Sequence, residues 1–307
     1  MAKPHIVVVG SSNTDMIIKM DRIPKPGETI LGGEFIKAAG GKGANQAVGA
    51  ARAGGHVTFI ARVGTDMFGD QAIAGFARDA IDVDYVIRDE SSPSGVALIF
   101  VGKNGENSIA VAPGANGKLS PEDILNAKAA FAGARVVLIQ LETPLVTVEA
   151  AAEAALAAGA RVILNPAPAQ KLPDRLLRNI SILTPNETEA ELLTGIKVDS
   201  TAAAEDAAKA LMSKGVETVV ITLGARGALV ANADGSEVVT GIKAKAVDTT
   251  AAGDVFNGAL AVALAEGQPL HEAVRFANAA GAISVTRMGA QVSAPHREEI
   301  ERLLATA

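Results

Sequence analysis

Short apolar runs alternate along the chain with longer, Ala-rich segments in which apolar residues recur at helical spacing. The runs predict buried strands at 6–9, 57–60, 135–139, 161–164, 180–183 and 218–222. The segments between them predict helices at 44–53, 68–80, 144–158, 187–194, 201–214 and 253–266. Strands that alternate with helices are typical of a parallel sheet covered on both faces. The pattern therefore predicts an α/β fold, a three-layer α/β/α, Rossmann-like arrangement around a mostly parallel sheet.

Two segments interrupt this alternation, at 13–40 and 94–113. The first has an apolar stretch, a Pro- and Gly-rich turn and a second stretch of mixed polarity. The second predicts a hairpin, because Asn104-Gly105 lies between two β-rich runs and Asn-Gly is a strong turn signal. We expect the two segments to form a small antiparallel β-sheet that covers the site as a lid and also makes a dimer contact. The α/β domain would then comprise residues 1–12, 41–93 and 114–307.

Composition limits the partners that this chain can have. Its 307 residues are 49% hydrophobic, enough to bury a large core, and no Cys is present for a disulfide or a nucleophile. Aromatic residues are only 3% and the net charge is −6, which disfavours a nucleic-acid-binding surface. The N-terminal residues lack the pattern of a signal peptide, and no run is long and apolar enough to span a bilayer. We therefore expect a cytoplasmic, soluble protein that binds neither nucleic acid nor membrane.

The most informative motif is the run from Asp248 to Asp254, which leads directly into an apolar helical pattern. Its small residues allow a tight turn, and the helix that follows adds unpaired N–H groups and the positive end of its dipole. Such a site attracts anions. Asp254 stands beside it, which suggests proton abstraction next to a phosphoryl group. The alternative is that Asp254 is only a favourable acid in a first helical turn.

Two Gly-containing loops follow predicted strands or precede predicted helices. Gly40 to Ala47 brings Lys42 and Asn45 into a Gly-rich turn, and a ligand loop and a plain flexible turn are about equally favoured. The spacing is not that of a Walker A loop. Gly10 to Asp15 follows the first strand, where open α/β sheets bind ligands. An Asx turn that ends the strand is the simpler interpretation there.

Three further motifs lie at strand ends. Gln140-Leu141-Glu142 places a carboxylate at the edge of the sheet, although it also suits a helix cap. Asn186 and Glu189 share a face of a first helical turn, where they suit Mg²⁺ or a capping box, or both. The segment 222–227 suits nucleotide phosphates, although a plain hairpin turn into 228–231 is the simpler interpretation.

These motifs occur in one order along one chain and together resemble the ribokinase (PfkB-type) sugar kinase family. The elements that carry the resemblance are Asn13 with Asp15, the Gly-Gly-Lys-Gly-x-Asn loop, Asn186-x-x-Glu189 and Asp-Thr-x-x-Ala-Gly-Asp. It covers essentially the whole chain, including the lid segments. The resemblance implies ATP-dependent phosphorylation of a sugar hydroxymethyl group, here O5 of D-ribose, with Mg²⁺ and a monovalent cation, typically K⁺.

The resemblance also implies a role for individual residues. The catalytic loop would be Ala251, Ala252, Gly253 and Asp254, with Asp254 as the base and backbone N–H groups as an anion hole. Ribose would be held by Asn13, Asp15, Gly41, Lys42, Asn45 and Glu142, besides Asp254. The nucleotide would contact Asn186, Glu189, Thr222, Gly224, Gly227, Gly253 and Asn278. Potassium would be held by Asp248, Thr250, Ser284, Arg287, Gly289 and Ser293, several of them through backbone carbonyls.

One position departs from the family pattern. Many family members have Gly where this chain has Ala251, and a methyl group is tolerated there if φ is negative.

Three other functions compete. A nicotinamide-dependent oxidoreductase is disfavoured because no Gly-x-Gly-x-x-Gly follows the first strand. A non-catalytic sugar-binding regulator is disfavoured because it has no need of a base beside an anion hole. Kinases of the same family for 2-deoxyribose, nucleosides or other sugars remain as alternatives.

Overall fold

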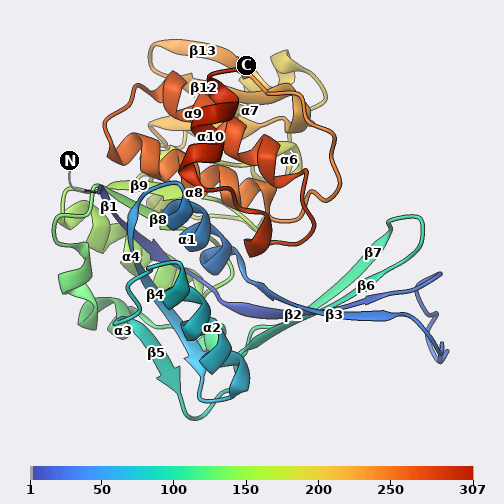
Figure 1. The fold of residues 1–307 in the computed structure, drawn as a ribbon. Coiled ribbons are helices and arrows are strands. Elements are labelled where there is room, and N and C mark those ends of the chain that lie inside the picture. The colour runs from blue at the N-terminus through green and yellow to red at the C-terminus, as the bar shows by residue number, and fades with distance from the viewer. Residues whose placement is uncertain (1–2, 307) are drawn as a thin grey trace.

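The computed structural model describes residues 3–306, and its centre is a nine-stranded sheet (Figure 1). The strands are β1 (His5–Val9), β4 (His56–Gly64), β5 (Val86–Asp89), β8 (Val136–Ile139), β9 (Arg161–Leu164), β10 (Ile182–Leu183), β11 (Thr218–Thr222), β12 (Gly227–Asn232) and β13 (Gly235–Thr240). Their order is β13-β12-β11-β10-β9-β8-β1-β4-β5. Neighbours from β11 to β5 are parallel, whereas β12 and β13 add an antiparallel edge. This is the mostly parallel sheet that the sequence predicts.

Helices cover both faces of this sheet, and each face has its own hydrophobic core. One face packs against α1 (Lys42–Arg52), α2 (Met67–Arg78), α8 (Ala252–Ala265), α9 (Leu270–Ser284) and α10 (Arg297–Leu304). The other packs against α3 (Pro121–Asn126), α4 (Leu145–Ala157), α5 (Asp174–Leu177), α6 (Glu187–Thr194) and α7 (Thr201–Met212). Strand β1 shows why both faces are buried: Ile6 and Val8 join the first core, and Val7 and Val9 the second.

The predicted elements are found with small shifts at their ends. Strand β10 begins at Ile182 instead of residue 180, because Ile180 closes a turn after α5 by donating to the Leu177 carbonyl at 3.1 Å. The pattern did not identify β5, or β13, whose residues are mostly exposed. Among residues 3–306, no helix is long and apolar enough to cross a membrane. Four 3₁₀ helices complete the chain: Gly114–Lys118, Lys128–Phe131, Gly224–Arg226 and Gln291–Ser293.

A second sheet extends away from this body, as Figure 1 shows for β2, β3, β6 and β7. Its strands are β2 (Asn13–Lys19), β3 (Glu34–Gly40), β6 (Gly95–Val101) and β7 (Asn107–Ala112), in the order β3-β2-β6-β7. We call these four strands the projecting sheet. Its two hairpins are antiparallel, as expected, but β2 and β6 pair in parallel where the two segments meet. The parallel pairing arises because both strands leave the body in the same direction.

Candidate active site

The residues singled out in the sequence gather at the carboxyl ends of the parallel strands, near the base of the projecting sheet. Ser11 follows β1, Glu142 follows β8, Asn165 follows β9 and Thr184 follows β10. The first turns of α1 and α8 lie at the same edge: the Lys42 N–H at the start of α1 donates to Glu142, and Asn45 on α1 donates to Asp254 on α8. Ligands of open α/β sheets bind at this edge. The topology therefore creates one polar cleft from segments that are far apart in the sequence.

Glycines let the start of α1 pack directly against the loop after β1. Gly41 has φ of +88°, which favours glycine, and a Cβ on it would lie 2.7 Å from the Asn13 nitrogen. A Cβ on Gly43 would lie 2.5 Å from the Ser11 nitrogen. This close approach brings the N–H of Lys42 to Glu142 Oε2, at 2.9 Å, and the Ser11 hydroxyl to the same oxygen, at 2.5 Å. The structure therefore places Gly41, Lys42 and Glu142 together, as the sequence predicts.

Asp254 is buried in the first turn of α8 and faces α1. Its Oδ2 accepts a hydrogen bond from Asn45 Nδ2 and its Oδ1 accepts one from Gln46 Nε2, both at 2.9 Å. Burial raises the pKa of Asp254, while the charge of Lys42 and the two amide donors oppose that rise. A buried carboxylate with its lone pairs oriented by neutral donors is suited to accept a proton.

Asp15 joins Glu142 and Asp254 in the same cleft. Burial, and then the charges of Glu142 and Asp254, raise the pKa of Asp15 to about 6. Asn13, at the root of β2, accepts a hydrogen bond on Oδ1 from Asn116 Nδ2 at 2.7 Å, which fixes its orientation. Several hydrogen-bond acceptors thus converge on one point, an arrangement that suits a ligand with many hydroxyl groups.

Asn45 shows where such a ligand would bind. Its Nδ2 is used by Asp254, but its buried Oδ1 has no hydrogen-bond partner among residues 3–306. A buried polar atom without a partner is costly, so a donor from a ligand would remove the cost. Asn45 can therefore accept from one hydroxyl while its other end holds the base.

The loop before α8 does not meet the condition expected from the sequence for Ala251. A methyl group is tolerated there if φ is negative, but Ala251 has φ of +60° and ψ of +10°, in the left-handed region. Glycine adopts this conformation without cost, whereas Ala adopts it with some strain. The surrounding loop therefore holds Ala251 in a left-handed backbone conformation that glycine adopts more easily.

The backbone donors of this loop are partly committed. The N–H of Ala252 donates to the Thr249 carbonyl at 3.2 Å, so it is less available to an anion than expected from the sequence. Those of Ala251, Gly253 and Asp254 have no acceptor among residues 3–306. A Cβ on Gly253 would meet no atom within 4 Å, so the space beside the loop is open. An anion has room to bind there, next to Asp254.

The predicted nucleotide residues lie beside the cleft, most of them at the carboxyl ends of β10 and β11. Asn186 and Glu189 form a capping box at the start of α6, with both hydrogen bonds at 2.8 Å. Burial raises the pKa of Glu189. Thr222 forms an isolated parallel bridge with Asn186, which brings the two loops together. Gly224 and Gly227, with φ of +58° and +99°, shape the turn after β11, which leads into the antiparallel strand β12. Asn278, on α9, donates to the Val239 carbonyl at 3.1 Å.

The predicted cation residues lie in loops around the start of α8 and the end of α9. Asp248 accepts from the Thr250 N–H and hydroxyl and from the Gly289 N–H, so these two loops are joined. Although burial opposes it, these hydrogen bonds hold the pKa of Asp248 below its usual value. Ser284 ends α9, whereas Ser293 lies in the following 3₁₀ helix and the Arg287 guanidinium pairs with Glu299.

The chemistry of these groups is hydroxyl, carbonyl and one carboxylate. Within the part of the chain that the structure describes, no cluster of three or more His, Cys, Asp or Glu residues could hold a metal ion. Oxygen groups of this kind suit a hard cation rather than a soft transition metal.

Several buried polar residues of the cleft had no assigned role in the sequence. Ser11 bridges the start of α1 and Glu142, and Asn116 fixes Asn13. Gln46, Gln140 and Asn165 form a chain of amides behind Asp254. Except for Asn116, which lies inside a 3₁₀ helix, each is an amide or hydroxyl just after a buried strand or within the first turns of a helix, which is the signal that could have identified it.

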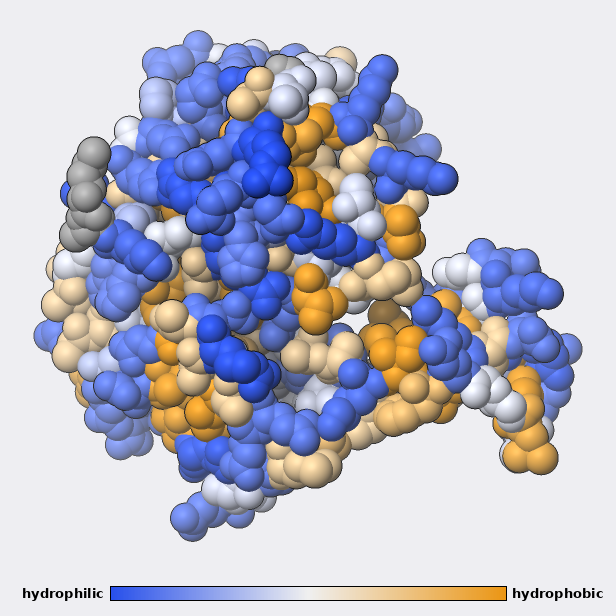
Figure 2. Space-filling model, viewed as in Figure 1, coloured by the Kyte–Doolittle hydropathy of each residue, from blue (hydrophilic) through white to orange (hydrophobic). Residues whose placement is uncertain are grey.

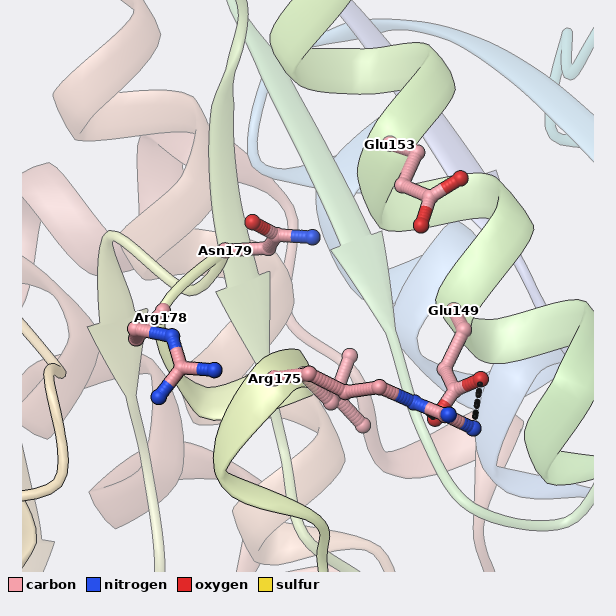
Figure 3. Close-up of a pocket in the computed structure, with 6 residues that line it drawn as sticks. Glu149, Glu153, Arg175, Arg178 and Asn179 are labelled. Atoms are coloured by element: carbon pink, nitrogen blue, oxygen red, sulfur yellow. Dashed lines mark hydrogen bonds and ion pairs between the residues drawn. The ribbon is translucent and has the colours of Figure 1, made fainter.

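A separate pocket of ≈ 260 Å³ lies outside this cleft, between α4 and the segment that includes α5 (Figure 3). It is lined by Glu149, Glu153, Arg175, Leu176, Arg178 and Asn179. Arg175 already pairs with Glu149, at 2.9 Å, as the dashed line in Figure 3 shows. None of the predicted site residues lines this pocket, so we place the chemistry in the cleft at the strand ends.

Comparisons with known proteins identify the family to which this chain is similar. Residues 3–297 match the model of the pfkB family of carbohydrate kinases. A protein of Haemophilus influenzae named ribokinase is 47% identical over 98% of this chain and 99% of its own length. A deoxyribokinase of Salmonella typhimurium is 38% identical over 98% of each chain. The structure of Arabidopsis thaliana ribokinase complexed with ribose and ATP is 36% identical, with a TM-score of 0.93 and 99% of both chains covered.

Proposed function

Because this chain belongs to the pfkB family of carbohydrate kinases, we propose that it is a ribokinase, which transfers the γ-phosphoryl group of ATP to O5 of D-ribose. The products are D-ribose 5-phosphate and ADP. The observation that carries the proposal is the buried Asp254 carboxylate beside an open helix N-terminus. The cleft in front of it holds the acceptors that a sugar needs.

The mechanism follows from the position of Asp254. Its carboxylate accepts the proton of the ribose O5 hydroxyl as that oxygen attacks the γ-phosphorus, and the bond to the β–γ bridging oxygen of ATP breaks. Charge that develops on the transferred group is stabilised by the N–H groups of Gly253 and Asp254 and by the helix dipole. Proton transfer to a positioned base typically contributes about 10²–10⁴-fold in rate.

Ribose recognition is assigned to the polar groups around the base. Asp15 and Glu142 accept hydrogen bonds from sugar hydroxyls, and Lys42 reduces the repulsion between the carboxylates. Asn13 and Asn45 supply amide groups on either side. The projecting sheet carries Asn13 and Asp15 on β2, so it acts as the lid that excludes water from the transfer.

ATP is assigned to the edge formed by Asn186, Thr222 and the turn through Gly224 and Gly227, with Asn278 nearby on α9. Mg²⁺, when bound, neutralises phosphate charge. Asn186 and Glu189 fit it because their capping box uses only one Glu189 carboxylate oxygen, Oε2, leaving the other for a magnesium-bound water.

Potassium is assigned to the loops around Asp248, which accepts hydrogen bonds from Thr250 and Gly289 and so holds the two loops together. The residues assigned to it are Asp248, Thr250, Ser284, Arg287, Gly289 and Ser293. When bound, the cation would supply positive charge close to the catalytic loop. These residues order the backbone whose N–H groups face the phosphate.

Dimerisation through the lid is supported by an apolar row across the projecting sheet. Its register aligns Ile36, Ile17, Ile99 and Ile109, one from each strand. The row lies on the same face as Asp15, since alternate residues of a strand point the same way. Ile109 is 55% exposed, and Figure 2 shows hydrophobic surface at the base and tip of this sheet. A second copy would cover it. We place the enzyme in the cytoplasm, where ATP is available.

A coupled ADP-release assay over a small panel of sugars tests this function. We expect rapid ADP release with D-ribose, none above the ATPase background with 5-deoxyribose, and stimulation by K⁺ relative to a choline buffer. The 5-deoxy sugar is the matched control because it lacks only the attacking hydroxyl. ADP release that is the same with and without ribose would refute the assignment.

The second candidate substrate is 2-deoxyribose, because a deoxyribokinase is among the similar proteins. The same assay distinguishes the two sugars through the ratio of their kcat/KM values. A single hydroxyl contact to a buried polar group discriminates strongly, because the group is left without a partner when that hydroxyl is missing. A ratio in favour of 2-deoxyribose would move the substrate assignment without changing the mechanism.

A further inference from the structure

A chain of buried amides stands behind the proposed base and has no part in the mechanism so far. Gln46 and Gln140 are 0% exposed and Asn165 is 7% exposed. Gln140 Nε2 donates to Gln46 Oε1 at 2.6 Å, and Gln46 Nε2 donates both to Asn165 Oδ1, at 3.1 Å, and to Asp254 Oδ1, at 2.9 Å. All three hydrogen-bonding contacts of the Gln46 amide are therefore made inside the protein.

The orientation of this chain is fixed from a backbone carbonyl. Asn165 Nδ2 donates to the Thr184 carbonyl at 3.0 Å, and a carbonyl can only accept. Asn165 Oδ1 must then face Gln46, which presents its Nε2 to it. The second hydrogen of that nitrogen points to Asp254. A flipped Gln46 amide would set its oxygen against two acceptors, Asp254 and Asn165.

Close packing of α1 on α8 holds the two residues at this distance. A Cβ on Gly258 would lie 2.6 Å from the Ala50 nitrogen and 2.7 Å from the Gln46 carbonyl oxygen. A Cβ on Gly49 would lie 3.3 Å from the Val255 Cα. The helices therefore touch backbone to backbone, one turn from Asp254, and neither can shift to lengthen the hydrogen bond.

We propose that Gln46 is a positioning residue that holds the Asp254 carboxylate toward the sugar hydroxyl, and that Gln140 and Asn165 hold Gln46 in turn. The inference rests on the proposed function, in which Asp254 is the base. Asn45 holds Oδ2 from the substrate side, whereas Gln46 holds Oδ1 from inside the protein. The two donors together prevent rotation of the carboxylate.

Removal of the Gln46 donor also has a defined effect on proton affinity. The charged groups that face Asp254 are Lys42 on α1, Asp15 on β2, Glu142 after β8 and Glu189 on α6. All of them stay in a Gln46 variant. A donor to the carboxylate favours its ionised form, so its loss raises the pKa of Asp254 and shifts the acid limb of the rate profile to higher pH.

The test compares Gln46→Met with wild type in the single-turnover rate of phosphoryl transfer, measured from pH 5 to 9 with saturating ATP and ribose. Saturation is needed because Asp15 titrates in the free enzyme. We expect the rate at pH 7 to fall about 10–100-fold, the range for a hydrogen bond to a charged group. The acid limb should rise by about one to two pH units. The dissociation constant of ribose should change less than about threefold.

Thr147→Val is the matched control. The Thr147 hydroxyl is also fully buried and donates to the Leu119 carbonyl at 2.6 Å, but it lies on α4, in the opposite core. Its loss lowers stability and should leave both the rate and the pH profile unchanged. A Gln46→Met enzyme with the wild-type rate, or with an unchanged acid limb, would overturn the proposal.

If Gln46→Met does not fold, Gln140→Met tests the proposal instead. It removes the hydrogen bond from Gln140 that holds the Gln46 amide and leaves the hydrogen bond from Gln46 to Asp254. A slower rate with a raised acid limb supports the proposal, and the wild-type profile contradicts it. The carboxyl carbon-13 signal of Asp254, identified by its loss in Asp254→Asn, gives the same comparison of pKa without substrate. A wild-type protein inactive on ribose would refute the proposed function, whereas an unshifted Asp254 signal would refute the positioning role.

Discussion

At Asp15, ligand binding and folding stability make opposite demands. Its pKa is raised to about 6 in the folded protein, from an ordinary value of 3.8, by burial and by two nearby carboxylates. The unfolded chain therefore releases this proton first as pH rises, and the folded state loses stability between about pH 4 and pH 6. The cost persists at neutral pH, where the ionised group is the one proposed to bind the sugar.

Asp15→Asn should therefore stabilise the protein while weakening its affinity for ribose. The gain in the free energy of unfolding should reach about 2–3 kcal/mol above pH 6, since a pKa unit corresponds to about 1.4 kcal/mol, and should vanish near pH 4. Urea unfolding at pH 4.5 and 7.5 measures it. Asp21→Asn, at an exposed aspartate beyond β2, is the control and should show neither effect. A pH-independent difference would contradict the interpretation.

Ala251 also lowers the stability of the fold, because its backbone is strained in the left-handed region. Ala251→Gly should raise the free energy of unfolding by about 0.5–1 kcal/mol, because the relief of strain exceeds the entropy that glycine adds to the unfolded chain. Ala80→Gly is a matched control, since Ala80 has φ of +56° and lies far along the chain, after α2. Both variants should be stabilised in urea unfolding. A destabilised Ala251→Gly would show that the methyl group contributes packing instead of strain.

Helix α1 is the element that aligns the site, and its first turn depends on close backbone contact. Gly43→Ala should lower the free energy of unfolding by more than about 2 kcal/mol, because its Cβ would lie 2.5 Å from the Ser11 nitrogen. Gly75→Ala, within α2, is the control: its Cβ would contact only the end of Arg78, at 3.7 Å. That variant should gain about 0.5–1 kcal/mol from helix propensity.

Thermal or urea unfolding compares the two variants, and ribose binding to Gly43→Ala should be lost with the displaced Lys42 and Asn45. Equal and small changes in both variants would mean that the start of α1 moves away easily and does not set the geometry.

The periodicity of apolar residues was sufficient to predict the strands that are buried on both faces and the helices that cover them. The strands of the parallel core are largely apolar, and capping residues such as Ser120 and Asn186 mark helix starts. Strand β13 was not identified because only one of its residues is buried. The parallel pairing of β2 with β6 depends on how two distant insertions meet, which neither segment encodes alone.

For the site, the motifs were sufficient to predict which residues lie together in the cleft. They did not predict the hydrogen bonds and backbone conformations that fix each residue there. Asn45 and Asp254 meet as expected, but the φ of Ala251 is set by the surrounding loop and not by its own preference. The amide chain through Gln46 was missed because glutamine is usually a surface residue, and only the tertiary contacts show that it is buried.

For the whole molecule, the apolar row on the projecting sheet, half-buried except for the exposed Ile109, predicts a dimer in solution. Ile109→Glu should convert the dimer to a monomer in sedimentation equilibrium, because a buried, unpaired charge at the contact is costly. Val238→Glu is the matched control, since Val238 is a 38% exposed residue on the edge strand β13. The control should remain dimeric. A wild-type protein that is monomeric at high concentration would refute this contact.

Asp254 is the proposed base of the phosphoryl transfer to ribose. The direct test is the rate of ribose-dependent ADP release by Asp254→Asn, with ribose binding followed by calorimetry. We expect a rate about 10²–10⁴-fold below that of wild type, with ribose still bound, because the amide keeps the shape of the side chain and cannot accept the proton. Wild-type turnover by Asp254→Asn would contradict this role.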